Sequence, residues 1–368
     1  MLLYIFIVIW IFCLSLFGVT FYAKGSEPQR IQNKSKKARK KVKRARFLAF
    51  ITLVFLWVLT AFRSSNIGND TKNYIHYFKI FAEGGIDLKR TFELGYQMLN
   101  VFIGWFTRDP HIFLIVIATV LYLGASICIF KNSKNILISV CILFCLCFSL
   151  FASMFRQGIA MIIALYGFYQ LKKNKKARAV ILFLLATLFH TSAIVCFFLF
   201  IDTKLFAHKY YVLAITVAVS VLSMFGVFNS IIIALFPRYK HYFLGQYASS
   251  GWLAVSYEVI RNIVFYVITR KAINSNKREE RLVLTNMSAL LLCSALGFSV
   301  NLFTRLSQYF LLVAVCEIPN VLYSEKIKKK KTWAICICAV LLVMFLLILI
   351  FRPNWNHLYP YEFWSVGK

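Results

Sequence analysis

Lysine and arginine lie in short clusters that alternate with apolar segments along the chain. Two apolar segments separate each neighbouring pair of clusters, and 30 of the 43 basic residues fall in six stretches: 24–46, 131–135, 172–178, 202–209, 270–281 and 325–331. Cytoplasmic loops of membrane proteins carry excess Lys and Arg, so this alternation is typical of a chain that crosses a membrane repeatedly. The polar residues that we therefore expect on the outer side are Asp70, Glu93, Arg156, Gln157, His190 and Arg305.

The composition supports one multi-span unit over residues 1–368. The chain is 60% hydrophobic, which exceeds the apolar share of an ordinary soluble domain and excludes a disordered chain. The formal charge of +30 could also suit a nucleic acid. Because the charges alternate with spans and no recognition module is visible, we expect no nucleic-acid partner. We expect contacts with anionic lipid headgroups instead.

The cysteines and the first segment carry further information. All ten cysteines lie in apolar runs, and no Cys/His cluster has zinc-ligand spacing, so we expect neither a metal nor another cofactor. The first cationic residue, Lys24, follows the first apolar run. The first helix is therefore predicted to enter with its N-terminus on the extracytoplasmic side.

Hydropathy predicts an all-α, polytopic protein of the cell (inner) membrane with about twelve transmembrane helices, since a helical span takes about 20 residues. An even number of crossings also puts the C-terminal tail, 352–368, outside. The predicted spans are 2–22, 47–62, 110–130, 136–153, 158–171, 179–190, 191–201, 210–228, 256–269, 282–303, 307–323 and 332–351.

Three connections are long. We expect 23–46 to be a basic cytoplasmic loop, and 63–109 and 229–255 to be extracytoplasmic. Segment 93–107 is apolar enough to cross, but a crossing there would move all later basic clusters outside, so we predict an interfacial or re-entrant helix. In the stretch before it, the aromatic side chains fall on one helical face, which is typical of a helix in the membrane interface: Tyr74, Phe78 and Phe81.

Two arginines are candidates for chemistry. Arg156, followed by Gln157, and Arg305 each stand beside apolar runs, where a guanidinium is costly unless it is paired or faces water. Either could instead reach the outer headgroups as an anchor. Together they could bind a diphosphate, because the planar guanidinium matches phosphate oxygens.

His190 ends an apolar run, and a neutral imidazole can accept a proton from a hydroxyl nucleophile. The alternative is a hydrogen-bonded helix connector. Asp70 lies in a turn-rich segment and Glu93 begins an apolar segment, so either could be a helix-capping carboxylate. Either could also be an alternative base or a sugar ligand. Three polar residues inside or at the edge of later spans could pair structurally or line a cavity: Glu258, Arg261 and Glu317.

Over about residues 50–325 and the stretch Asn356–Trp364, the sequence resembles the EpsG family of Wzy-like polysaccharide polymerases. The resemblance rests on five short motifs in a fixed order. They are G-x-D before an aromatic stretch (Gly68, Asp70, Tyr74), E-x-G-Y (Glu93, Gly95, Tyr96), R-Q-x-x-A (Arg156, Gln157, Ala160), F-H-x-S-A (Phe189, His190, Ser192, Ala193) and an arginine before Tyr-Phe (Arg305, Tyr309, Phe310).

This resemblance implies a GT-C-like membrane glycosyltransferase that joins polyprenyl-diphosphate-linked repeat units, such as those on undecaprenyl diphosphate, without a nucleotide sugar or a metal. It implies His190, Arg156 and Arg305 as catalytic residues, and a substrate-binding group of Asp70, Glu93, Gln157 and Tyr74. The products would be exopolysaccharide, capsule or O-antigen, and a chain-length regulator and a flippase would be partners. Two alternatives stay open: a flippase of lipid-linked oligosaccharide and a membrane acyltransferase that modifies exopolysaccharide.

Overall fold

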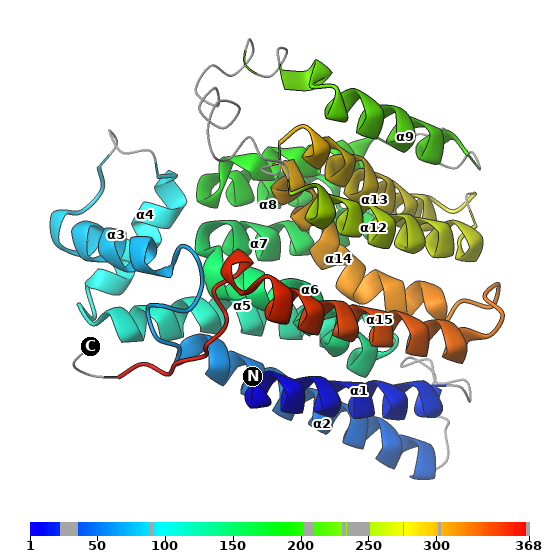
Figure 1. The fold of residues 1–368 in the computed structure, drawn as a ribbon, viewed down its shortest axis with the longest axis horizontal. Helices are drawn as coiled ribbons and strands as arrows, with labels where there is room; N and C mark the ends of the chain where they lie inside the picture. Colours follow the sequence, from blue (N-terminus) through cyan, green and yellow to red (C-terminus); the bar gives the residue numbers. More distant parts are fainter. Residues whose placement is uncertain are drawn as a thin grey trace. The chain divides into compact units, whose positions relative to one another are not determined.

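The computed structural model describes residues 1–22, 36–87, 92–201, 206, 210–229, 233, 251–274, 276–300 and 303–365. Regular structure in these residues is helical, apart from an isolated bridge between Arg63 and Phe363 (Figure 1). Most of the predicted outer loop 229–255 lies outside the described residues. The chain forms two compact units. Unit 1 comprises Met1–Tyr166, Leu184–Thr191 and Lys328–Lys368, and unit 2 comprises Gly167–Phe183 and Ser192–Ile327.

Unit 1 consists mainly of helices from the N-terminal part and the C-terminal part of the chain. Helices α7 and α8 each contribute residues to both units. Its helices are α1 (Leu2–Tyr22), α2 (Lys36–Ala61), α3 (Thr71–Gly84), α4 (Leu94–Gly104), α5 (Pro110–Asn132), α6 (Ile136–Ser153), the first part of α7 (Phe155–Lys172), the last part of α8 (Lys176–Phe189) and α15 (Lys330–Phe351). Asp109 caps α5 by accepting a hydrogen bond from the backbone N–H of His111 at 2.8 Å, and Pro110 suits the first position of the helix, where no backbone N–H is needed.

The basic clusters of unit 1 meet at one end of its helices. The Asn135 amide at the start of α6 donates to the carbonyl of Gly18 near the end of α1, at 3.2 Å. Arg46, in the basic first part of α2, donates to the carbonyl of Phe130 near the end of α5, at 3.5 Å. The described part of cluster 24–46 and cluster 131–135 therefore share an end, as the alternating charge pattern predicts.

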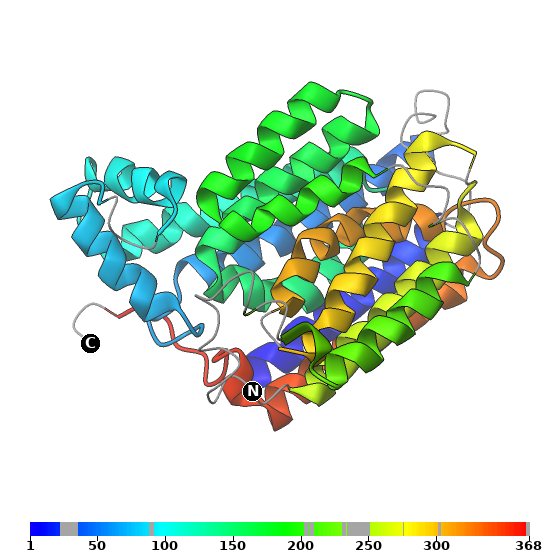
Figure 2. The same ribbon diagram turned by 90° about the horizontal axis from the view of Figure 1, so that it is seen from above.

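The opposite end of unit 1 is covered by the segment after α15, which begins with the short 3-10 helix η8 (Pro353–Trp355). In Figure 2 this red segment runs along the loop that precedes α3. Its contacts reach α1, α2 and that loop: Tyr4 hydroxyl to Leu358 O at 2.8 Å, Tyr361 hydroxyl to Leu59 O at 2.6 Å, and Gly68 N–H to His357 O at 2.9 Å. We call residues 353–364 the C-terminal strap.

The aromatic stripe of α3 is a packing face of unit 1. Phe78 and Phe81 are fully buried, and the Phe78 ring stacks on Phe113 of α5 with 4.5 Å between ring centroids. Tyr74 stacks in the same way on Phe155 of α7, at 4.5 Å. The aromatic stripe, whose pattern predicted a helix in the membrane interface, therefore packs against other helices of the protein. Aromatic rings of α5 and α7 stack on Phe78 and Tyr74.

Unit 2 contains η2 (Thr191–Phe200, from Ser192 onward), α9 (Tyr211–Met224), α12 (Trp252–Ala272), α13 (Arg278–Ala295), η6 (Leu296–Phe298) and α14 (Thr304–Leu322). Its described basic clusters, 172–178, 270–281 and the first residues of 325–331, also share an end, while the lysines of cluster 202–209 lie outside the described residues. The contacts there are Arg278 to Leu171 O at 3.3 Å, Ser324 to Ala272 O at 3.1 Å and Lys326 to Ile273 O at 2.8 Å. At the other end, the hydroxyls of Ser192 and Tyr309 lie 3.0 Å apart.

Each of the twelve predicted spans overlaps a described helix; span 191–201 overlaps the 3-10 helix η2, and span 282–303 includes the 3-10 helix η6. Seven of the described helices are long and apolar enough to cross a membrane: α1, α2, α5, α6, α12, α13 with η6, and α15. The structure is thus that of a helical membrane protein. The count of twelve crossings, the GT-C-like architecture and the side on which each loop lies remain predictions.

The two ends of unit 1 allow a direct test of topology. In a cysteine-free background, we expect a membrane-impermeant maleimide to label Lys72→Cys in intact cells, since Lys72 is exposed on α3 in the predicted outer segment. The matched variant Lys131→Cys, exposed at the basic end, should react only after permeabilisation. The opposite labelling of the two positions would invert the topology and place the candidate site in the cytoplasm.

Candidate active site around Glu93

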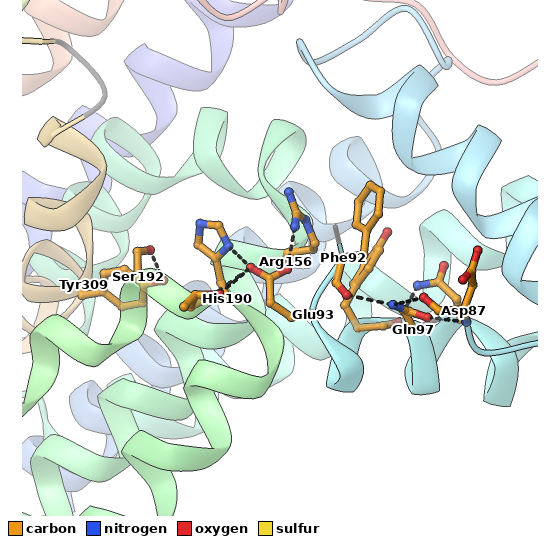
Figure 3. A network of polar contacts seen from close by, with 11 residues as sticks. Asp87, Phe92, Glu93, Gln97, Arg156, His190, Ser192 and Tyr309 are labelled. Carbon is orange, nitrogen blue, oxygen red and sulfur yellow. Dashed lines mark hydrogen bonds and ion pairs between the residues drawn. The ribbon is translucent and has the colours of Figure 1, made fainter. Parts of the chain in front are cut away.

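The carboxylate of Glu93 is the centre of a polar cluster in unit 1. One oxygen accepts from Arg156 Nη1 at 2.5 Å. The other lies 2.9 Å from His190 Nδ1, and also accepts from the backbone N–H and the hydroxyl of Thr191 at 3.2 and 3.3 Å. Figure 3 shows the imidazole and the guanidinium approaching the two oxygens of the same carboxylate. The structure therefore brings together three residues that are far apart in the sequence.

Local backbone features place Glu93 there. Glu93 has extended geometry immediately before α4, while His190 follows the last residue of α8. Gly95, in the first turn of α4, lies against the end of α8: a Cβ at this position would come within 2.8 Å of the Leu188 carbonyl. The glycine of E-x-G-Y thus allows the two helix ends to approach until Glu93 reaches His190.

A buried amide fixes the backbone just before Glu93. Gln97 is 1% exposed, and its amide donates to the carbonyl of Phe92 at 2.8 Å and accepts from the backbone N–H of Asp87 at 2.9 Å (Figure 3). The Phe92 ring in turn lies below the Arg156 guanidinium, with 4.5 Å between the guanidinium carbon and the ring centroid. This cation–π contact and the ion pair hold Arg156 in one orientation.

Electrostatics keep Glu93 ionised. Its burial raises the pKa, but the hydrogen bond with His190 and the charge of Arg156 outweigh burial and lower the pKa from 4.5 to about 2. An ionised carboxylate can only accept hydrogen bonds, so Nδ1 of His190 must carry the proton that is shared with it. The lone pair of a neutral His190 is then on Nε2, which has no hydrogen-bond partner among the described residues. The side chain of His190 remains 21% exposed.

A second cation, Arg63, is buried near the cluster and contacts the residue that precedes Arg156. Arg63 is 1% exposed, and its guanidinium carbon is 5.0 Å from the ring centroid of Phe155, the residue before Arg156. Burial lowers the pKa of Arg63 from 12.5 to about 10, so the guanidinium stays cationic at neutral pH. Its Nη1 donates to the Thr60 carbonyl, while Nε and Nη2 have no partner in the described part of the chain. Arg63 therefore adds positive potential to this end of unit 1.

The other predicted site residues lie elsewhere. Asp70 is the residue immediately before α3, is partly buried and makes no capping hydrogen bond. The loop before it depends on Gly68, which has φ +88° and approaches the Ala152 carbonyl too closely for a Cβ. Gln157 is 3% exposed on α7. Arg305 is exposed in the first turn of α14, in unit 2.

Tyr74 lies beside the cluster, next to Arg156. It is 7% exposed, and its side chain interacts electrostatically with Arg156.

The sequence pattern indicated Glu93, Arg156 and His190 as separate candidates. It did not find the roles of Thr191 and Phe92, which have no distinctive pattern, or that of Gly95. Within the described residues, no group of three or more His, Cys, Asp or Glu side chains could hold a metal ion.

The close approach at Gly95 predicts a large effect from a small substitution. Gly95→Ala should separate Glu93 from His190 and reduce activity at least tenfold, because the added methyl group would meet the Leu188 backbone at 2.8 Å. Gly84→Ala is the matched control, since a Cβ there has open space. Chain extension by the purified variants measures the difference. Equal activity of the two variants would show that the approach of α4 to α8 is not needed.

The comparisons with known proteins give one match. Residues 46–363, which are most of the chain, match the model of the EpsG family. No curated protein and no solved structure matches the sequence.

Proposed function

Because this chain belongs to the EpsG family of Wzy-like polymerases, we propose that it joins polyprenyl-diphosphate-linked oligosaccharide repeat units into exopolysaccharide, capsule or O-antigen. The reaction takes place on the outer face of the cell membrane, and both described chain ends are extracytoplasmic. The observation that carries the proposal is the cluster of His190, Glu93 and Arg156, which combines a proton acceptor with a cation at one end of unit 1.

The reaction is a glycosyl transfer from lipid diphosphate to a sugar hydroxyl. The oxygen of the acceptor hydroxyl forms a bond to the anomeric carbon of the donor, and the bond between that carbon and the diphosphate oxygen breaks. The hydroxyl proton passes to Nε2 of His190, and the electron pair of the broken bond leaves with the diphosphate. The enzyme therefore needs a positioned base and charge for the leaving group.

Glu93 is a positioning residue in this scheme. Its four described hydrogen-bond donors and its pKa of about 2 make it a weak proton acceptor. Its charge fixes the proton of His190 on Nδ1, which leaves Nε2 free to accept, and it stabilises the imidazolium that forms. This arrangement favours His190 over Glu93 as the base.

Arg156 and Arg305 are proposed to bind the diphosphate. One Nη of Arg156 is held by Glu93, while its side chain stays 23% exposed, so the guanidinium can still donate to phosphate oxygens. Arg305 is exposed and is assigned the same ligand by its place in the family motif. With two arginines to neutralise the departing charge, the reaction needs no metal. Asp70, Tyr74 and Gln157 are proposed to contact the saccharide.

Family membership favours polymerisation over the two alternatives, a flippase and a membrane acyltransferase. Further proposed contacts are anionic lipids at the basic clusters, and a chain-length regulator and a flippase as partner proteins.

The test uses the purified full-length protein and lipid-linked repeat units extracted from cells that lack it. We expect a ladder of longer lipid-linked glycans without a nucleotide sugar, and the same ladder in the presence of EDTA. The deletion strain should accumulate single lipid-linked units and lack polymer. If the units only change membrane leaflet in proteoliposomes and no ladder forms, the protein is a flippase and the proposal is wrong.

A further inference from the structure

Helix α12 of unit 2 carries three neighbouring side chains with unpaired polar atoms. Glu258 Oε2, Arg261 Nη2 and Asn262 Nδ2 are all buried and have no hydrogen-bond partner among the described residues. Arg261 is 9% exposed and Asn262 is 0% exposed. The only described hydrogen bond between them runs from Arg261 Nε to Asn262 Oδ1, at 3.1 Å. The unpaired atoms thus belong to three residues within five consecutive positions of one helix.

Such a group is costly in this helix. α12 is one of the seven candidate membrane spans, where polar side chains are expensive unless they have a function. A buried polar atom without a partner is destabilising, because it loses its hydrogen bonds to water and gains none in the protein. Glu258 and Arg261 are three residues apart and could pair along the helix, but Glu258 Oε2 and Arg261 Nη2 both lack a partner among the described residues. The atoms therefore need a partner that the described residues do not supply, and a bound ligand would provide one.

The kinds of atom restrict the partner. Arg261 and Asn262 offer donors, while Glu258 offers an acceptor. A sugar hydroxyl donates and accepts at once, so vicinal hydroxyls satisfy both kinds of group. A diphosphate only accepts and would meet the oxygen of Glu258. The Tyr257 ring, 5.4 Å from the Arg261 guanidinium carbon, adds an aromatic surface of the kind that lines ligand sites.

We propose that Glu258, Arg261 and Asn262 form a saccharide-binding subsite that holds sugar hydroxyls of a lipid-linked repeat unit. The inference rests on the proposed function, because a polymerase joins two glycans and must hold both. The subsite begins six residues after Trp252, the first residue of α12, so the group lies about 9–15 Å along the helix axis. That depth suits a saccharide that enters the helix bundle from the end of α12 opposite its basic residues.

The test compares two probes on the full-length protein in nanodiscs. One probe is the lipid-free oligosaccharide released by mild acid from the cell's own lipid-linked units, and the other is inorganic pyrophosphate. Saccharide binding is measured by saturation-transfer NMR titration, and binding of pyrophosphate, which has no carbon-bound protons, by isothermal titration calorimetry. Asn262→Leu and Glu258→Gln should each weaken saccharide binding at least tenfold and leave pyrophosphate binding unchanged. Glu279→Gln, exposed on α13, should change neither.

Stability separates a ligand site from a structural cluster. Asn262→Asp keeps an oxygen that can accept from Arg261 Nε and removes only the unpaired Nδ2 donor, so its melting temperature should equal or exceed that of the parent protein while saccharide binding falls. Asn262→Leu also removes the acceptor of Arg261 Nε, so its melting temperature should be lower than that of Asn262→Asp.

Normal saccharide binding by both variants would overturn the subsite, as would a loss of pyrophosphate binding in place of saccharide binding. Absence of saccharide binding by the parent protein would also overturn it. These results leave the proposed function standing as long as the parent protein forms the glycan ladder. Failure to form that ladder from lipid-linked units is the separate result that would refute the proposed function.

Discussion

His190→Ala is expected to lower the rate of chain extension by about a thousandfold, because a positioned general base contributes about 10²–10⁴ to such a step. The imidazole is held by Glu93 at 2.9 Å, and its second nitrogen has no partner among the described residues, so its removal leaves no other base in that place. Rates are measured in vitro with purified lipid-linked repeat units at saturating concentration. Substrate binding should be nearly unchanged, so the loss should lie in kcat rather than in KM.

His76→Ala provides the matched control, because His76 is exposed on α3 and lies outside the cluster. It should extend chains at the normal rate. If His190→Ala also keeps a near-normal rate while Asp70→Asn is inactive, the base is a carboxylate and His190 is a helix connector.

Glu93→Gln is expected to lower activity by about a hundredfold and the free energy of unfolding by about 3 kcal/mol, since breaking one side of a partly buried ion pair leaves Arg156 without its counter-charge. The amide also removes the charge that fixes the proton on Nδ1 of His190. Chain extension and thermal unfolding of the purified protein measure the two effects. Glu83→Gln, exposed on α3, is the control and should change neither.

The low pKa of Glu93 also predicts how its contribution depends on pH. The pKa is about 2 in the folded protein against an ordinary value of 4.5, so the ionised group stabilises the fold fully above pH 4.5. This stabilisation is lost as the pH falls from 4.5 towards 2. The difference in melting temperature between the parent protein and Glu93→Gln should therefore shrink across that range. A difference that stays constant down to pH 2 would contradict the role given to the ion pair.

The positions of the helices could be predicted because a membrane span requires a long apolar run, which is visible in the sequence. The first residue of α7 could not be predicted in this way: the predicted span begins at residue 158, whereas the helix begins at Phe155. Arg156 and Gln157 suggested a polar connection. The guanidinium is instead paired with Glu93, which allows the helix to begin before it.

The members of the site were also predictable as single residues, but their mutual contacts were not. Glu93, Arg156 and His190 come from three helix ends, and only tertiary packing shows that one carboxylate binds the other two. Gly95 was the available signal, since a glycine in an otherwise apolar helix often marks a close approach. The spacing of Glu258, Arg261 and Asn262 on one helical face was a comparable signal.

Unit 1 combines segments from both ends of the chain, so it is completed only late in translation. Its last helix, α15, packs its Phe345 ring against Phe144 of α6 with 4.5 Å between centroids, and the C-terminal strap binds the loop before Asp70. Unit 2 is encoded between the parts of unit 1. The ribosome must therefore make all of unit 2 before the strap exists. The loop of Asp70 reaches its final support only when residue 357 has been synthesised, so this end of unit 1 stays incomplete throughout most of the translation of the chain.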